Sequence, residues 1–296
     1  MRDEIDGRLA ALREQLCQAY GWTHVELRVA LEPSRVRVTG TVAVPSLAAR
    51  VRALLEPCIG PSRELELELR PMPVLSWHRI SAPKLELWAE HPSLGERSLA
   101  TELLGEDGPI GLLAEAPPGT LVRARDGTVG WLLGELGPDS PPRPLSGPRL
   151  PDDPGATLVE AARAYLGVPY QLGGTSFARI DCSGLVARAY AALGIVLPRN
   201  SRDQLAIGAS EPLGRAEGQA GDLLFMRSRA LGRSHVGLAT GRGTVIHASR
   251  SRDAVLEEPA REFESDAEGL RRVRRQAVVE WSRGQIGRAH VELPTA

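Results

Sequence analysis

The sequence has few cysteines, few aromatic residues and almost no net charge. Its 296 residues include three cysteines, and aromatic side chains make up 4% of the chain. Cys17, Cys58 and Cys182 are too widely spaced for a disulfide framework or a CxxC metal knuckle, which fits a reducing compartment. A formal net charge of -1 gives no electrostatic reason to expect nucleic acid or an anionic membrane as a partner.

Long apolar runs are also lacking. No window holds about 18 uninterrupted apolar residues, so we expect no membrane span. The N-terminus leads into an amphipathic segment instead of the apolar run of a secretory signal, so we expect a cytoplasmic protein. The length and the 42% hydrophobic content suit roughly two or three globular domains.

Residues 1–72 are predicted to form a small α/β module. Apolar residues recur at helical spacing from Ile5 to Leu16, and residues 25–31 and 36–42 alternate like the strands of a hairpin. A second helix over residues 46–55 and a last strand over residues 65–69 complete an αββαβ order. This order resembles the BON family of small interaction domains. A generic helix-on-sheet packing module is the alternative.

Residues 77–136 are predicted to form a small β-barrel, because short strand candidates alternate with Pro, Gly and Asp. The candidates are residues 85–88, 99–104, 110–113, 120–122 and 129–133. The segment RDGTVGW, which ends at Trp131, resembles the close of a bacterial SH3 domain. That resemblance implies binding of cell-wall material or a wall on one side of an active site. Trp131 is equally well interpreted as an aromatic core anchor.

Residues 137–155 contain seven prolines and are predicted to be a linker. A domain over residues 156–281 follows, with helices from Thr157 and Cys182 and with strands over residues 221–226, 234–240, 243–248 and 273–279. This pattern predicts an α+β domain with helices packed on an antiparallel sheet. Residues 282–296 are interpreted as a tail, in which GRAHV resembles a cloning artefact.

The third domain carries the parts of a cysteine nucleophile and its base. Asp181 is interpreted as an N-cap that places Cys182 in the first turn of a helix, where the positive helix end lowers a thiol pKa. His235 is the candidate general base, and His247, twelve residues later, is the candidate for orienting it. Two alternatives remain, namely a packing thiol with satisfied histidines and a zinc site of one thiolate and two imidazoles.

Five sequence blocks in this domain carry a family resemblance. They are DCSGLV from residue 181, LPRNSRDQ from 197, AGDLLF from 220, HVGL from 235 and IHAS from 246. In this order they look like an NlpC/P60 papain-like cysteine peptidase over residues 157–280. The resemblance implies that Cys182 is the nucleophile, His235 the base and His247 the third residue, with no metal and no cofactor.

The resemblance also implies residues that meet the substrate. Tyr170 matches a tyrosine that helps to stabilise the oxyanion together with the backbone N–H of Cys182. Asp181 and Ser183 match positions that line the substrate pocket, although Asp181 is also explained as a cap. Ser201 is a further candidate. Asn200 stands where related recycling enzymes have an acidic residue that pairs with the substrate amine, so recognition of a free amine is weaker here.

An SH3-like domain ahead of such a peptidase is similar to cytoplasmic murein-recycling γ-D-glutamyl-diamino acid endopeptidases. The implied substrate is the cell-wall peptide L-Ala-γ-D-Glu-diamino acid. The alternatives are an exported or phage-type hydrolase of intact peptidoglycan, a non-catalytic wall-binding or adaptor protein, and an acyltransferase with the same Cys-His chemistry.

Overall fold

The structure is a computed structural model that describes residues 1–20, 25–44, 46–60, 62–142, 147–229 and 232–285. The described chain folds into two compact units. The first comprises Met1–Ala100 and Gly105–Pro142, and the second comprises Thr101–Leu104 and residues 147–285. In the part that is described, no helix combines the length and the apolar character needed to cross a membrane.

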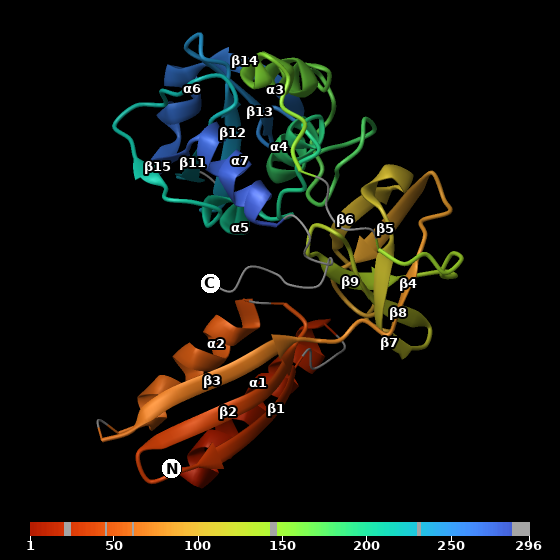
Figure 1. Cartoon of the computed structure of the whole chain (residues 1–296), viewed down its shortest axis with the longest axis vertical. Helices are drawn as coiled ribbons and strands as arrows, with labels where there is room; N and C mark the ends of the chain where they lie inside the picture. Colours follow the sequence, from red (N-terminus) through yellow and green to blue (C-terminus); the bar gives the residue numbers. More distant parts are fainter. Residues whose placement is uncertain (21–24, 45, 61, 143–146, 230–231, 286–296) are drawn as a thin grey trace. The chain divides into compact units, whose positions relative to one another are not determined.

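The first unit begins with a three-stranded sheet and two helices (Figure 1). The elements are α1 (Arg2–Tyr20), β1 (Val25–Leu31), β2 (Arg35–Val42), α2 (Ser46–Leu55), the 3₁₀ turn η1 (Glu56–Cys58) and β3 (Glu64–Pro71). Strand β2 lies between β1, which is antiparallel to it, and β3, which is parallel to it. This element order agrees with the αββαβ prediction. The likeness to the BON family stays a prediction.

Alternation along β2 explains how this sheet packs. Val36 and Val38 are fully buried in a core shared with the apolar face of α1 and with α2. Arg35 and Arg37 point to the other face and bind Glu66 of β3 at 3.2 Å and 3.0 Å. Period-two patterning therefore gives one apolar and one charged face.

A further six-stranded sheet has the order β4-β7-β8-β9-β5-β6, and its residues belong to the first unit except Thr101–Leu104 of β6. Its elements are β4 (Ser76–His78), β5 (Lys84–Trp88), β6 (Leu99–Leu104), η2 (Gly105–Asp107), β7 (Ile110–Ala116), β8 (Gly119–Arg123) and β9 (Val129–Leu132). Trp131 is fully buried, and its ring meets that of His91 edge-on at 4.5 Å. Trp131 is thus a core anchor. The likeness of this region to SH3 domains stays a prediction.

The second unit is built on another six-stranded sheet, with the order β10-β15-β11-β12-β13-β14 and antiparallel pairing throughout. The strands are β10 (Glu211–Pro212), β11 (Leu223–Ser228), β12 (Ser234–Ala239), β13 (Thr244–Ser249), β14 (Ala254–Pro259) and β15 (Ala267–Val273). The helices are α3 (Pro154–Arg163), α4 (Cys182–Ala191), α5 (Ser201–Leu205), α6 (Ala260–Ser265) and α7 (Arg275–Gly284).

Two apolar cores cover the two faces of this sheet. One joins Leu158 of α3, Leu185 of α4 and Val278 of α7 to buried residues of the central strands. The other joins Phe263 of α6 to Leu224 and other residues that point the opposite way. The arrangement confirms a mixed fold of helices packed on an antiparallel sheet.

Two predicted boundaries are wrong. Helix α3 begins at Pro154 and not at Thr157, because the Asp153 side chain accepts the N–H of Ala156 at 2.9 Å and proline suits the first helical turn. Residues 275–279 were predicted as strand but belong to α7. The N–H of Arg275 donates to Asp222 Oδ1 at 2.8 Å, so a residue distant in sequence stabilises the start of this helix.

Several elements were not predicted: β4 in the first unit, and β10, β14, α5, α6 and all of β15 except Val273 in the second. The predicted tail overlaps the end of α7 at residues 282–284, and its remainder from residue 286, including GRAHV, lies outside the described residues. Strand β14 matters most, because it carries a side chain of the candidate active site.

Candidate active site

The candidate site begins at the N-terminus of α4. Asp181 is the N-cap, and its Oδ1 accepts the N–H of Gly184 at 2.7 Å, which leaves Cys182 as the first helical residue. A Cβ on Gly184 would lie 2.5 Å from the carbonyl oxygen of Gly174, so the loop packs here against a residue without a side chain. The DCSG block therefore fixes both the cap and the close approach of the loop.

Asp181 does more than cap the helix. Its side chain is 3% exposed and pairs with Arg199, 4% exposed, at 2.7 Å between Oδ2 and Nη2. The carboxylate also accepts the N–H of Gly173 at 2.7 Å and the hydroxyl of Ser183 at 3.1 Å. The structure thus holds Asp181 and Ser183 inside a buried network, and their contact with substrate stays a prediction.

The Cys182 thiol is buried, with 7% of the residue exposed. Burial raises the pKa of Cys182 to about 12, and the nearby Asp181 charge adds to the rise. The backbone N–H groups of Val236 and Ser183 and the Arg199 guanidinium oppose this rise in pKa. The predicted lowering of the thiol pKa by the helix end is therefore wrong, because desolvation outweighs the favourable donors.

The two imidazoles lie side by side on β12 and β13. His235 Nε2 and His247 Nδ1 are 2.8 Å apart, and the two rings meet edge-on with centroids 5.0 Å apart. Burial first, and then the His247 charge, lower the pKa of His235 to about 3, while the charges of Asp266 and Asp181 oppose this lowering. His235 is therefore neutral at pH 7, as a general base must be.

The nitrogen contact also bears on the zinc alternative. Two nitrogens at this distance share a proton, whereas two ligands of one zinc point their lone pairs at the metal. Among the hydrogen bonds of the described residues, none joins the Cys182 thiol to His235. The sulfur lies instead against the N–H of Val236, the residue that follows His235.

Glu258 on β14 is the residue that sequence reasoning missed. Its Oε1 lies 2.9 Å from His247 Nε2. His247 stands opposite Leu256 across the β13–β14 pair, so Glu258 is its diagonal neighbour on the same face of the sheet. The β-branched Val255 is the local sequence signal for this strand, and the structure buries it. Nothing local distinguished Glu258 from Glu257, which bonds Arg163 at 2.9 Å.

Tyr170 lies close to the thiol. Burial raises the pKa of its phenol, and the charges of Cys182 and Asp181 add to the rise, while Arg250 and Arg199 oppose it. The phenol therefore keeps its proton at neutral pH and can donate a hydrogen bond. The oxyanion role of Tyr170 stays a prediction.

Residues 167–268 match the model of the NlpC/P60 family. The chain carries an NlpC/P60 family domain. A probable endopeptidase of Corynebacterium glutamicum is 43% identical over 97 residues, which cover 33% of this chain and 44% of that protein. The γ-DL-glutamyl hydrolase of Bacillus subtilis is 36% identical, over 42% and 31% of the two chains. The murein DD-endopeptidase/LD-carboxypeptidase MepS of Escherichia coli is 35% identical, over 33% and 52%.

The chain thus spans about half or less of the length of these curated relatives. Among solved structures, an NlpC/P60 family protein of Bacillus cereus is 25% identical and aligns with a TM-score of 0.37, over 68% of this chain and 63% of that one. The peptidoglycan hydrolase RipB of Mycobacterium tuberculosis is 30% identical and aligns with a TM-score of 0.33, over 40% and 63%.

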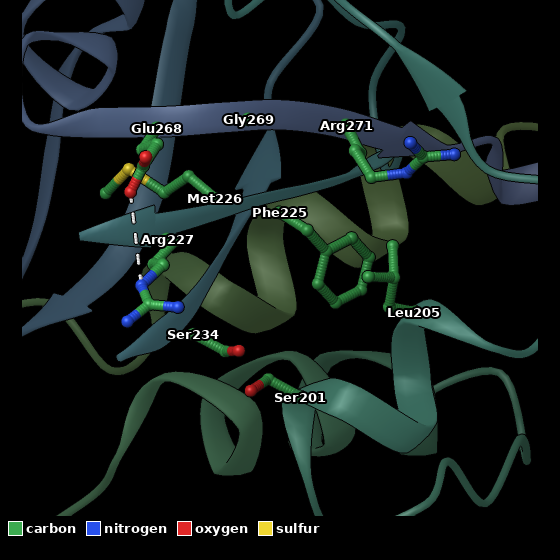
Figure 2. Close-up of a pocket in the computed structure, with 9 residues that line it drawn as sticks. All are labelled: Ser201, Leu205, Phe225, Met226, Arg227, Ser234, Glu268, Gly269 and Arg271. Atoms are coloured by element: carbon green, nitrogen blue, oxygen red, sulfur yellow. Dashed lines mark ion pairs between the residues drawn. The ribbon is translucent and has the colours of Figure 1, made fainter. Parts of the chain in front are cut away.

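A cavity of about 300 Å³ opens in the NlpC/P60 domain, and its lining does not include Cys182, His235 or His247 (Figure 2). The hydroxyls of Ser201 and Ser234 point toward each other across it, and Ser234 immediately precedes His235. Arg227 and Glu268 form an exposed pair at 4.0 Å on its rim. The lining residues are Ser201, Leu205, Phe225, Met226, Arg227, Ser234, Glu268, Gly269 and Arg271.

Ser201 lines this cavity, and its role near the substrate stays a prediction. Asn200 is the N-cap residue of α5, is exposed and makes no side-chain cap bond, so its amide is accessible to a ligand. Neither residue takes part in the buried network around Asp181.

The loop before Cys182 is held by residues that the sequence did not single out. Within the second unit, the Glu102 side chain accepts the N–H of Thr175 at 3.1 Å, and its carbonyl oxygen accepts the Thr175 hydroxyl at 2.8 Å. Arg199 Nε donates to the Thr101 hydroxyl at 2.9 Å. These buried contacts link the short segment Thr101–Leu104 to the loop that presents the thiol.

Proposed function

We propose that the NlpC/P60 domain is a cysteine endopeptidase that cleaves an amide bond in cell-wall peptides. The observation that carries this proposal is the state of His235. Its imidazole is neutral, bonds His247 and lies on β12, the strand against which the helix of Cys182 packs. The family match and the endopeptidase names of the relatives support the same class of reaction.

The proposed reaction starts from a neutral thiol and a neutral imidazole. As the Cys182 sulfur attacks the substrate carbonyl carbon, its proton passes to His235. The tetrahedral intermediate collapses when His235 gives that proton to the leaving amine, and a thioester remains. Water then attacks the thioester, again with His235 as base, and releases the acid and the thiol.

Two donors are placed to stabilise the oxyanion. The first N–H groups of a helix have no intrahelical partner, so the N–H of Cys182 is available at the start of α4. The Tyr170 hydroxyl stays protonated because its pKa is raised. We expect Tyr170→Phe to lower kcat ~100- to 1000-fold while KM changes little.

Our finer proposal for the substrate is L-Ala-γ-D-Glu-diamino acid, cleaved after D-glutamate by a cytoplasmic recycling enzyme. A γ-linked glutamate keeps a free carboxylate, which needs a cation near the nucleophile. Arg199 is committed to Asp181, whereas Arg250 is exposed and close enough to act on Tyr170. Arg250→Ala should therefore raise KM with little loss of kcat, and an unchanged KM would argue against this contact.

The direct test is hydrolysis of L-Ala-γ-D-Glu-diaminopimelate, followed by mass spectrometry. We expect L-Ala-γ-D-Glu as a product with the native protein and no product with Cys182→Ala. The same product from both proteins, or from neither, would refute the proposal.

A second candidate is a hydrolase of intact peptidoglycan, which is favoured by the names of MepS and of RipB, 36% identical over 117 residues. Incubation with purified sacculi separates the candidates, because a recycling enzyme should remain in solution and release nothing from the polymer. Release of soluble fragments would favour the wall hydrolase. Binding to sacculi without cleavage of either substrate would favour a wall-binding or adaptor protein.

A further inference from the structure

Glu258 is a buried carboxylate that the sequence motifs leave unassigned. Its side chain is 15% exposed, and among the described residues His247 is its one hydrogen-bond partner, at 2.9 Å. A carboxylate that is largely removed from water must be compensated by a donor. His247 supplies that donor from Nε2.

The direction of this hydrogen bond fixes the proton on each imidazole in turn. An ionised carboxylate only accepts, so the proton of neutral His247 sits on Nε2 and its Nδ1 bears a lone pair. That lone pair faces His235 Nε2 at 2.8 Å, which must then carry the proton of His235. The remaining nitrogen of His235, Nδ1, is left unprotonated.

We propose that Glu258 is a positioning residue that acts through His247 to keep Nδ1 of His235 free to accept the thiol proton. The inference rests on the proposed function, since it assigns a base to the Cys182 reaction. The Glu258 carboxylate sets a direction that the two histidines do not set themselves, because two neutral imidazoles alone can share their proton in either direction.

The opposite direction of the hydrogen bond between the two imidazoles would block the proposed base. If His247 carries its proton on Nδ1, that proton is donated to His235 Nε2, and the proton of neutral His235 then sits on Nδ1. The base is then blocked on the nitrogen left for the thiol. Other charged groups near His235 are Asp181 and Asp266, and Phe263 packs against both rings, but none of these provides an acceptor for His247 Nε2.

Glu258→Gln tests the direction with almost no change in shape. The amide of glutamine either accepts from or donates to His247 Nε2, so both proton arrangements become accessible. We expect kcat on L-Ala-γ-D-Glu-diaminopimelate to fall ~10- to 100-fold with KM nearly unchanged, less than the ~10⁴-fold loss that a wrong tautomer causes when the orienting group contacts the base directly. Glu258→Asp keeps an acceptor-only group and should recover part of the loss.

Glu257→Gln is the matched control. Glu257 is the neighbouring carboxylate on β14, with 22% side-chain exposure, and it bonds Arg163 and Thr244 instead of an imidazole. Damage to β14 as a strand would affect both variants alike. A role in proton positioning would affect Glu258→Gln alone.

Ring ¹⁵N NMR of the intact protein reads the tautomers without any activity. We expect both His235 and His247 to carry their protons on Nε2 in the native protein, and a second population with His235 protonated on Nδ1 in Glu258→Gln. Native His235 protonated on Nδ1, or a Glu258→Gln protein whose spectra are unchanged and whose kcat stays within about twofold of Glu257→Gln, would overturn the proposal. An Asp variant no better than Gln would do the same.

The ring spectra also separate this inference from the proposed function. If the native protein cleaves neither the peptide nor sacculi, the peptidase proposal fails, while the tautomers still decide whether Glu258 sets the proton direction.

Discussion

The protonation state of Cys182 gives the sharpest prediction. Burial raises its pKa from 9.0 to about 12. Three pKa units correspond to about 4 kcal/mol of extra free energy for ionisation. At pH 7 the thiolate fraction is then ~10⁻⁵, against ~10⁻² for a thiol at the reference value, so alkylation should be slower about 1000-fold.

The assay is alkylation by iodoacetamide between pH 6 and pH 10, with each labelled peptide followed by mass spectrometry. Cys17 is exposed and serves as a reference thiol within the same chain. Only thiolate reacts, so the rate at Cys182 should still be rising at pH 10. Slow access to a buried sulfur lowers the rate at every pH, which is why the shape of the pH profile is the decisive observable.

The raised pKa of Cys182 also determines that its alkylation rate increases with pH. The neutral thiol is the form present at and below neutral pH, and the charged form appears only as pH rises toward 12. The groups that act on the sulfur are Asp181, Arg199, Tyr170 and the N–H groups of Val236 and Ser183. An alkylation rate at Cys182 that reaches its plateau below pH 8 would show a preformed thiolate and refute the reasoning.

Three further changes test the structure. Arg199→Met should cost ~3–5 kcal/mol of unfolding free energy in urea melts, because it leaves the Asp181 carboxylate buried without its cation; a loss below ~1 kcal/mol would contradict the network. Gly237→Ala puts a Cβ 2.5 Å from Val245 Cγ1, so stability should fall by ~1–3 kcal/mol and kcat should fall with it; unchanged melts would argue against this packing. Trp131→Ala should cost ~3–5 kcal/mol, and loss of wall binding without destabilisation would instead identify Trp131 as a ligand contact.

Several elements could be predicted because their signals are local. The alternation in β2, the helical spacing in α1 and the Asp-Cys-Ser-Gly cap of α4 are all readable from neighbouring residues. The start of α7 could not be predicted, because its first N–H is bound by Asp222, more than fifty residues earlier. The paired valines in this segment favoured a strand on propensity, and a tertiary contact overrode that preference.

The candidate site divides in the same way. Cys182, His235 and His247 could be picked out because reactive residue types stand in recognisable blocks at fixed order. Glu258 could not, because its role depends on a diagonal contact across β13 and β14, and Glu257 beside it looks identical in sequence.

The sequence by itself determined the candidate nucleophile and its two candidate histidines, where the thiol sits on its helix and that helices pack on an antiparallel sheet. The tertiary structure alone decided the protonation of those side chains. Desolvation sets the pKa of Cys182, and hydrogen bonds across the neighbouring strands β12, β13 and β14 connect the two imidazoles to Glu258. Neither can be read from residues that are adjacent along the chain.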